Sequence, residues 1–472
     1  MFRSAAELAA LVRTGELSAR ELVGHSLERI ESLDPELGAF VEVDAERALA
    51  TAAAIAPGDP RPFAGVPIAI KNNRAVEDLR LTHGSGLLRE QVASYDHSSV
   101  TRLRDAGFVI VGTTKLPEYG ILPVTEPLAY GPARNPWDPQ RTPGGSSGGS
   151  GAAVASGMVP IAHGNDGGGS LRIPAACCGL VGLKAQRHRV STAPDLGASP
   201  LVIDGVLTRT VAETASLLDI LAGYVSGDSS WAPPPREPFA QSAARAPAGL
   251  RIAHTTVPPM PGADVDPICA EAVTRACALA ESLGHRVEEF DPPWQDGGQQ
   301  MVDSFLDYFG VQVGVGMRFA AMSVGHDEPL EGEVEPMSWA IWERVRRIDA
   351  VAYQVLQAEW QLRMRWLVLS LEPYDALITP ALAQRPLPLG SLDTSAPDGF
   401  ATFRRSGLFT PFTSIFNMSG HPAVSLPLFE GEDGLPLGVQ VVGRPAEEGA
   451  LLALAAQLEQ AAPAATRRPR IS

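Results

Sequence analysis

Two glycine loops that carry serines, joined by apolar segments, constrain this chain more than any other part of it, and they lie within residues 141–184. The first loop, residues 144–150, reads GGSSGGS and runs into a helix-like segment at 152–156. The second, residues 164–170, reads GNDGGGS and follows residues 158–162, which we predict to be a short buried strand. Backbone N–H groups in a tight glycine turn at a helix N-terminus favour an anion or a developing negative charge.

Other interpretations of these loops fit the sequence less well. A flexible linker would not alternate with apolar runs such as residues 152–155 and 180–183. A phosphate-binding P-loop requires Gly-Lys-Ser/Thr after its glycines, and the chain contains no Gly-Lys pair. Residues 145–149 match the G-x-S-x-G pattern of a nucleophile elbow, but a single match is weak in a chain so rich in glycine.

Lysine is rare in this chain, and one lysine closes a predicted strand. Of the 38 basic residues only Lys71, Lys115 and Lys184 are lysines. Lys71 ends the apolar run 65–70, which is typical of a buried strand. Arginine stays protonated in proteins, whereas a lysine desolvated in an apolar pocket can be neutral near pH 7 and act as a base. Lys71 is therefore a candidate base; the alternative is a lysine that reaches from the strand end to water.

Together these motifs resemble the amidase signature family of hydrolases. The resemblance covers nearly the whole chain, is weakest at 226–405, and is most similar to the subgroup that contains the bacterial 6-aminohexanoate cyclic dimer hydrolase. One departure is Asn72, where the family usually has aspartate. The segments that carry the resemblance are Lys71 after its strand, GGSSGGS at 144–150, DGGGSLRIP at 166–174, CGLVGLK at 178–184, TEP at 125–127, NPW at 135–137, HGND at 163–166, and the closing segments TPF at 410–412, SGHPA at 419–423 and GLPLGVQ at 434–440.

The resemblance implies a Ser-Ser-Lys triad. Ser170 would be the nucleophile, Ser146 the bridging serine that follows a cis peptide bond, and Lys71 the base. Lys71 could then take the proton of Ser170 through the Ser146 hydroxyl without a histidine, and the same relay could protonate the leaving amine. The backbone N–H groups implied for the oxyanion hole are those of Gly167, Gly168, Gly169 and Ser170, with Asp166 and Arg172 bracing the loop.

Further candidates come from the surrounding sequence. Residues 116–137 form a proline-rich and aromatic segment that leads toward Ser146, so its side chains Tyr119, Glu126 and Tyr130 are candidate pocket residues. His163, close to both loops, would be the base of a Ser-His-Asp triad, although a packing histidine is the more common outcome in such an apolar strand. A metal hydrolase is disfavoured because the chain has no HExxH, no CxxC and no aspartate-rich loop.

Composition limits the class of protein. The 472 residues are 45% hydrophobic and 19% charged, which suits one large globular unit or two closely packed ones. We treat residues 1–472 as a single amidase domain, with 226–405 as its variable, substrate-shaping part. The net charge of -16 disfavours nucleic acid and anionic membranes as partners. The four cysteines suggest no disulfide framework, and we find no signal-peptide pattern, so we expect a cytoplasmic protein.

The order of predicted elements indicates an α/β fold. Predicted strands at 65–70, 108–111 and 158–162 alternate with helices, which favours a mixed, largely parallel central sheet covered by helices on both faces. Catalytic loops are then expected at strand ends. Long helices are predicted at 301–322 and 338–371, and one or two of their aromatic side chains could wall a substrate pocket.

The sequence thus predicts an amidase that hydrolyses a carboxylic amide through an acyl-enzyme on Ser170. We expect no cofactor, a small-molecule amide as substrate, and a monomer or homodimer. Three alternatives stay open: an esterase or carbamate hydrolase with the same triad, the amidase subunit of a transamidating complex, and a non-enzymatic protein whose glycine loops hold an anionic ligand.

Overall fold

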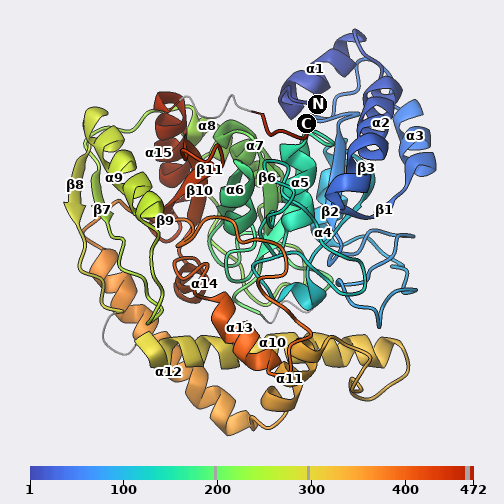
Figure 1. Ribbon diagram of the computed structural model, residues 1–472. Helices are drawn as coiled ribbons and strands as arrows, with labels where there is room; N and C mark the ends of the chain where they lie inside the picture. The colour runs from blue at the N-terminus through green and yellow to red at the C-terminus, as the bar shows by residue number, and fades with distance from the viewer. Residues whose placement is uncertain (196–198, 295–297, 463–467) are drawn as a thin grey trace.

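A single sheet organises the structure, a computed structural model that describes residues 1–195, 199–294, 298–462 and 468–472 (Figure 1). Within these ranges the sheet has eleven strands in the order β1-β3-β2-β4-β6-β5-β10-β11-β9-β7-β8. The strands are β1 (Phe40–Val43), β2 (Pro67–Lys71), β3 (Val109–Thr114), β4 (Ile161–Asp166), β5 (Val181–Lys184), β6 (Ile203–Thr208), β7 (Arg251–His254), β8 (Arg286–Glu289), β9 (Ala376–Pro380), β10 (Ala423–Glu430) and β11 (Pro436–Gly443).

Parallel and antiparallel pairs occupy different parts of the sheet. Strands β3, β2 and β4 are parallel neighbours, and so are β9, β7 and β8. The remaining pairs among the described strands, including the central run β4-β6-β5-β10-β11-β9, are antiparallel. The predicted mixed α/β sheet is confirmed, but its parallel share is smaller than expected. The reason is that β5 and β6, like β10 and β11, follow each other without an intervening helix, and such strands pair antiparallel.

Helices cover the sheet, and several begin where the sequence signals them. Ser4 with Glu7, and Ser18 with Glu21, form capping boxes at the first two helices, and Asp266 caps the ninth. The helices are α1 (Ala5–Thr14), α2 (Ala19–Leu37), α3 (Ala45–Ala53), α4 (Ser98–Asp105), α5 (Gly148–Ala155), α6 (Arg172–Cys178), α7 (Val211–Leu221), α8 (Phe239–Ala243), α9 (Pro267–Ser282), α10 (Gly298–Ser323), α11 (Pro336–Val345), α12 (Ala350–Leu371), α13 (Gly399–Ser406), α14 (Ser414–Ser419) and α15 (Glu448–Ala461), with a short 3-10 helix η1 (Glu118–Gly120).

Helices α10 to α13 form a layer below the ends of the strands, at the bottom of Figure 1. Helix α10 matches the predicted helix, but the helix predicted at 338–371 is two helices, α11 and α12. The chain turns at 346–349, where the Asp349 carboxylate accepts the N–H of Ala352 and starts α12 afresh. The side chains Met317, Ile341 and Phe403 pack this layer into a hydrophobic cluster of its own.

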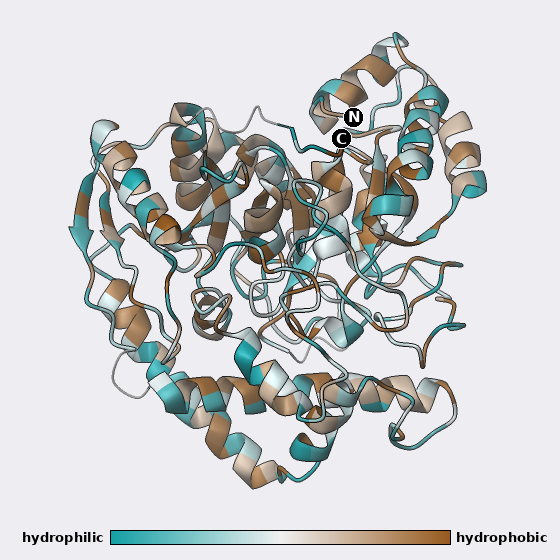
Figure 2. Cartoon of the chain, viewed as in Figure 1, coloured by the Kyte–Doolittle hydropathy of each residue, from teal (hydrophilic) through white to brown (hydrophobic). Residues whose placement is uncertain are grey.

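The core lies between the sheet and the helices packed on it. Figure 2 shows mostly hydrophobic residues in the central strands and in α5 and α6, whereas the edge strand β8 is hydrophilic. Charged edge strands of this kind resist pairing with other chains. Among the described helices, none has an apolar stretch long enough to cross a bilayer.

Strand β4 extends further than its hydrophobic pattern predicted. Residues 164–166, expected in the second glycine loop, belong to the strand because they pair with β6, with Asn165 opposite Asp204. Glycine is required at Gly164, since a Cβ there would lie 2.8 Å from the Ser147 hydroxyl oxygen. The glycine loop proper therefore begins at Gly167, directly at the end of β4.

Candidate active site

Lys71 lies at the end of β2 with no solvent exposure. Its Nζ is 2.7 Å from Ser146 Oγ and 2.7 Å from Asn165 Oδ1. Burial lowers the pKa of the Lys71 ammonium well below its usual value, and Arg74 lowers it further, whereas Asp204 and Asp166 act in the opposite direction. The sequence-based alternative of a lysine that reaches water is therefore wrong.

The other lysines are also buried. Lys115 is 6% exposed and Lys184 is fully buried, so no lysine side chain of this protein faces bulk solvent. Lys115 donates to the Tyr130 carbonyl and Lys184 to the Ala185 carbonyl. Only Lys71 has a serine hydroxyl among its hydrogen-bond partners in the described part of the chain.

Asn165 is a site residue that sequence reasoning missed. Besides accepting from Lys71, its amide donates to Asn73 Oδ1 at 2.9 Å, which fixes the amide orientation. Lys71 Nζ thus donates one hydrogen bond to the Asn165 amide oxygen and a second one to the Ser146 hydroxyl. Strand register could have found Asn165, because β2 and β4 are parallel neighbours, but this required knowing that β4 continues past Ala162.

Ser146 lies between the first glycine loop and α5. The Gly145–Ser146 peptide bond is cis, as the family resemblance implies. Glycine at position 145 is required by close packing, because a Cβ there would lie 2.6 Å from the Leu122 carbonyl oxygen. On its other side Ser146 abuts η1, where a Cβ on Gly120 would lie 3.2 Å from Ser146 Oγ.

Ser170 and Gly168 are partly exposed, whereas Asp166 and Gly167 beside them are buried. Both Ser170 and Gly168 line the same cavity as Gly120, the residue that touches Ser146. Ser170 therefore lines the cavity, and Ser146, which is hydrogen-bonded to Lys71, lies against Gly120 of the same cavity. The three residues Lys71, Ser146 and Ser170 are separated by up to 99 positions in the sequence.

A buried ion pair supports the second glycine loop. The Arg172 guanidinium contacts the Asp166 carboxylate through Nε and Nη2, both at 2.9 Å. Burial raises the pKa of Asp166, but the charge of Arg172 and its hydrogen bonds outweigh this and hold that pKa below its usual range. Asp166 also accepts the Gly169 N–H at 2.8 Å. The expected bracing role of Asp166 and Arg172 fits these contacts.

Three residues far along the chain hold the same loop, and sequence reasoning gave them no role. Arg172 Nη1 donates to the Thr413 carbonyl and to Gln440 Oε1, and the Asn417 amide donates to Asp166. The Thr413 hydroxyl donates to the Gly168 carbonyl at 2.6 Å. These contacts join positions more than 240 residues apart, so no local pattern could reveal them.

The expected oxyanion-hole donors differ in their availability. The Gly169 N–H already donates to Asp166, so it is the poorest candidate of the four. Gly167, Gly168 and Ser170 lie at the turn between β4 and α6. At Gly169 the backbone has φ of 132°, and a Cβ would lie 2.4 Å from Thr413 Oγ1. Only glycine fits this position.

Two residues of the alternative interpretations have structural partners. His163 is fully buried in β4, its Nε2 lies 3.8 Å from Asp204 Oδ2, and it does not line the cavity. Burial lowers the pKa of its imidazole. Asn72 accepts from Thr82 and donates to Thr113 and to the Arg80 carbonyl, so it stabilises a turn and makes no hydrogen bond to Lys71 in the described structure.

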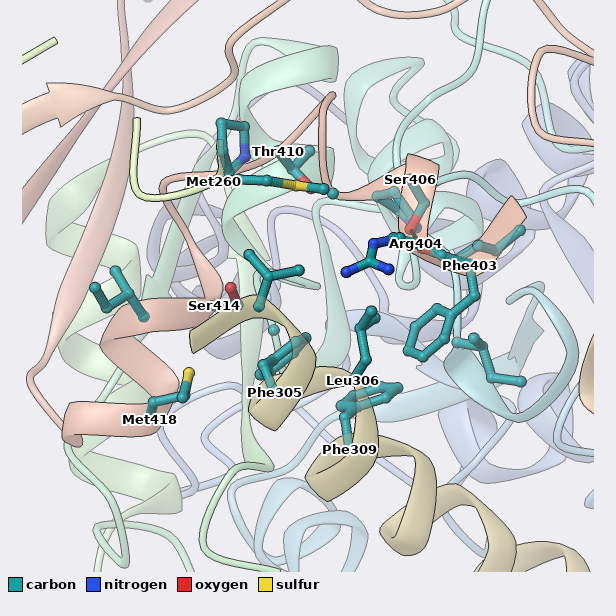
Figure 3. Close-up of a pocket in the computed structure, with 18 of the residues that line it drawn as sticks. Met260, Phe305, Leu306, Phe309, Phe403, Arg404, Ser406, Thr410, Ser414 and Met418 are labelled. Carbon is teal, nitrogen blue, oxygen red and sulfur yellow. Dashed lines mark hydrogen bonds between the residues drawn. The ribbon is translucent and has the colours of Figure 1, made fainter. Parts of the chain in front are cut away.

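The cavity beside Ser170 is narrow and mostly apolar. It has a volume of about 100 Å³ and is bounded by the 120–123 segment, α10, α13 and α14. Figure 3 shows Phe305, Leu306 and Phe309 of α10 facing Phe403 and Arg404 of α13. Phe305 and Phe309, two of the aromatic residues in the helix predicted at 301–322, line this cavity, and their role in a substrate pocket stays a prediction.

Tyr119, Glu126 and Tyr130 are not among the described residues that line this cavity. Glu126 accepts the Gly390 N–H, and the ring of Tyr130 lies beneath the Arg89 guanidinium. The Tyr119 hydroxyl is buried without a hydrogen-bond partner in the described structure. Their proximity in sequence to Ser146 did not bring them to the cavity because η1 turns at Gly120, and Gly120 to Pro123 form the wall instead.

Comparison with known proteins identifies the family. The family model described as Amidase matches residues 21–452. The 6-aminohexanoate-cyclic-dimer hydrolase of Pseudomonas sp. (strain NK87) is 36% identical over 490 residues, which covers 100% of this chain and 97% of the relative.

Solved structures are similar over the whole chain. A 6-aminohexanoate cyclic dimer hydrolase complexed with substrate has a TM-score of 0.92 at 34% identity, covering 100% of this chain and 99% of that one. A bacterial aryl acylamidase has a TM-score of 0.85 at 26% identity, covering 98% and 96%. The chain therefore belongs to the amidase signature family, and it is an amidohydrolase.

Proposed function

We propose that this protein hydrolyses carboxylic amides, linear or cyclic, through an acyl-enzyme on Ser170, with Ser146 and Lys71 as proton relay. The observation that carries the proposal is the fully buried Lys71 amine 2.7 Å from Ser146 Oγ, together with the position of Ser146 against Gly120, which lines the same cavity as Ser170. The relatives named as hydrolases of a cyclic amide support the substrate class.

In the proposed relay, Lys71 first accepts a proton through Ser146 and then returns a proton to the leaving group. As Ser170 Oγ attacks the amide carbonyl carbon, its proton passes to Ser146 Oγ, and the Ser146 proton passes to neutral Lys71. The resulting ammonium returns a proton through Ser146 to the amide nitrogen, so the C–N bond breaks with a neutral amine as leaving group. Water then attacks the ester on Ser170 by the same relay and releases the carboxylic acid.

The loop after β4 supplies the electrostatic support. The carbonyl oxygen becomes negative in the tetrahedral intermediate, and the N–H groups of Gly167, Gly168 and Ser170 are its candidate donors, because the Gly169 N–H is bound to Asp166. Loss of one such donor typically costs about 3 kcal/mol of transition-state stabilisation. Thr413 and Arg172 hold the loop from behind, so the donors do not need to reorganise during the reaction.

A serine-reactive fluorophosphonate tests the proposal. We expect a single adduct by intact-protein mass, mapped to Ser170 by peptide sequencing and absent in Ser170→Ala. Labelling should slow by at least about 100-fold in Ser146→Ala and Lys71→Met, because the nucleophile loses its proton acceptor. Lys115→Met is the matched control, since it removes a buried lysine amine bound to a carbonyl. Labelling that is unaffected in Lys71→Met would overturn the relay and make His163→Ala the next variant to test.

Turnover of matched amide, ester and carbamate substrates then separates the remaining activities. Amide hydrolysis by the purified chain alone supports the proposal. Hydrolysis of esters or carbamates without amides would favour the esterase alternative, and amide hydrolysis only with a co-purifying protein would favour the subunit of a transamidating complex.

A further inference from the structure

A single charged side chain enters the otherwise apolar cavity next to Ser170. Among the described residues that line the cavity, Arg404 alone carries a charge; the others are aliphatic, aromatic, glycine, proline or hydroxyl residues. Figure 3 shows the Arg404 guanidinium extending from α13 into the space between Leu306 and Met260. The Arg404 side chain is 42% exposed, so water can meet its free N–H groups when the cavity is empty. A bound molecule that displaces this water loses affinity unless it offers an acceptor in its place.

The fold holds this guanidinium in place with one carboxylate partner and leaves its other N–H groups to solvent. Phe403 anchors α13 in the core and packs against Phe309, which leaves the next residue, Arg404, at the cavity. Arg404 Nη2 donates to Asp303 Oδ1 on α10. An arginine has five N–H donors, and within the described ranges we find no second side-chain partner for this one.

We infer that Arg404 selects substrates whose chain, lying in the cavity, carries an oxygen acceptor at a fixed distance from the scissile bond. This inference rests on the proposed function and names its substrate class. The apolar stem of the chain would pack against Phe305 and Leu306, and its terminal carboxylate or carbonyl oxygen would accept from the guanidinium. A chain ending in a methyl group leaves the guanidinium without this partner, and one ending in an ammonium is repelled.

Asp303 should affect substrates that end in a carboxylate differently from substrates that end in a carbonyl oxygen. Its carboxylate contacts Arg404 but does not line the cavity, so it reduces the positive charge that the substrate meets. A carbonyl oxygen is little affected by this, whereas a carboxylate is attracted less than by a free arginine. Asp303→Asn should therefore shift selectivity toward the carboxylate.

The test uses p-nitroanilides of acyl chains with equal length that end in carboxylate, carboxamide, methyl or ammonium, in series of four, six and eight carbons. A mirrored series carries the same end groups on the amine side. In the wild-type enzyme we expect kcat/KM for the best oxygen-bearing chain to exceed that of its methyl counterpart by about 10- to 100-fold, the range of a charge-assisted hydrogen bond. Arg404→Met should remove this preference and leave methyl-ended substrates within about threefold.

Matched variants separate selection from structural support. Arg405→Met removes an exposed arginine from the same helix and should change no ratio. Arg404→Lys should restore part of the preference. If Arg404 only ties α13 to α10, Arg404→Met and Asp303→Asn will lower kcat/KM for all end groups alike, and the inference fails. Fluorophosphonate labelling of Ser170 in every variant tests the proposed function separately. If Ser170 is labelled normally but the wild-type enzyme shows no end-group preference, only the role of Arg404 is overturned.

Discussion

Lys71 shows how a single residue decides what this site can do. Three of its surroundings act together: complete burial, a hydroxyl at 2.7 Å, and an amide oxygen at 2.7 Å. Burial disfavours the ammonium, and the asparagine oxygen accepts an N–H without adding a negative charge. A carboxylate in the place of Asn165 would stabilise the protonated amine and weaken Lys71 as the proposed base near neutral pH. The chemistry therefore depends on an uncharged neighbour.

Activity should rise with pH through the lowered pKa of Lys71. The amine accepts a proton only when neutral, so the fluorophosphonate labelling rate should increase with pH and level off well below the usual lysine value of about 10.4. Labelling across a pH series measures the midpoint. A plateau that is reached only above pH 10 would contradict the lowered pKa.

Asn165→Asp should move that midpoint to higher pH. The new carboxylate would lie beside the Lys71 amine and favour its charged form, so we expect a rise of at least about one pH unit and about a tenfold loss of rate near pH 7. The rate should recover in alkaline buffer. Asn135→Asp is the control, because Asn135 is an equally buried amide that contacts the Cys177 carbonyl outside the site. An unchanged midpoint with a lower rate at every pH would indicate a distorted site instead.

At the scale of elements, the loop between η1 and α5, the turn between β4 and α6, and one distant helix form the proposed site. Ser146 precedes α5, Ser170 precedes α6, and α14 holds the second turn through Asn417. Because β10 lies beside β5 and β11 beside β10, the C-terminal part of the chain is brought back against the loop that follows β4. Elements near the C-terminal end of the family-matched region therefore stabilise a turn in its middle.

Gly169→Ala tests the packing of that turn. The added methyl would meet Thr413 and Ile173 at 2.4 and 2.6 Å in a backbone conformation that only glycine tolerates. We expect the turn to shift and labelling of Ser170 to fall by more than about 100-fold, with loss of the Thr413 contact to Gly168. Gly249→Ala is the control, since it has positive φ but open space around the Cβ. Normal labelling of Gly169→Ala would show that the turn does not need this geometry.

At the scale of the whole molecule, Glu118 links η1, which lies beside Ser146, to the helical layer of α10 to α13. Its carboxylate accepts from Ser85, from Ser338 and from the Glu335 N–H. Burial raises the pKa of Glu118 to about 7, and the charge of Glu335 adds to this. The folded protein therefore holds a proton here that the unfolded chain releases near pH 4.5.

The consequence is a fall in stability as pH rises from about 4.5 to 7, the window between the two pKa values, because the folded state binds more protons there. Glu118→Gln removes this contribution. Relative to wild type, the variant should lose less stability between pH 5 and 8, by about 1–3 kcal/mol in thermal or urea unfolding. Exposed Glu331→Gln is the control. Parallel stability curves for wild type and Glu118→Gln would contradict the raised pKa.

Local sequence patterns predict part of this structure. The Ser18–Glu21 pair of a capping box and the Asp266-Pro267 pair are local signals of helix starts, and Lys71 was predicted at the end of a buried strand. The family resemblance supplied Ser146 and Ser170, which the residues alone could not distinguish from neighbouring serines.

The rest depends on contacts between distant segments. The extension of β4 through Asn165 requires the pairing with β6, and the roles of Thr413, Asn417 and Gln440 require the neighbouring placement of β10 and β11. Hydrophobic periodicity indicates which side of a strand is buried, but it does not indicate which other strand pairs with it. The cavity wall could not be predicted for the same reason, since the break between α11 and α12 determines how that layer folds back.

The burial of every lysine gives the molecule a chemical property beyond catalysis. Reagents that acylate primary amines require an accessible, unprotonated side chain, and Lys71, Lys115 and Lys184 offer none while the protein is folded. Each becomes reactive once its strand or loop opens. A pulse of an N-hydroxysuccinimide ester, followed by peptide mass analysis, would therefore measure local opening at three internal positions, with Lys71 reporting on the active site itself.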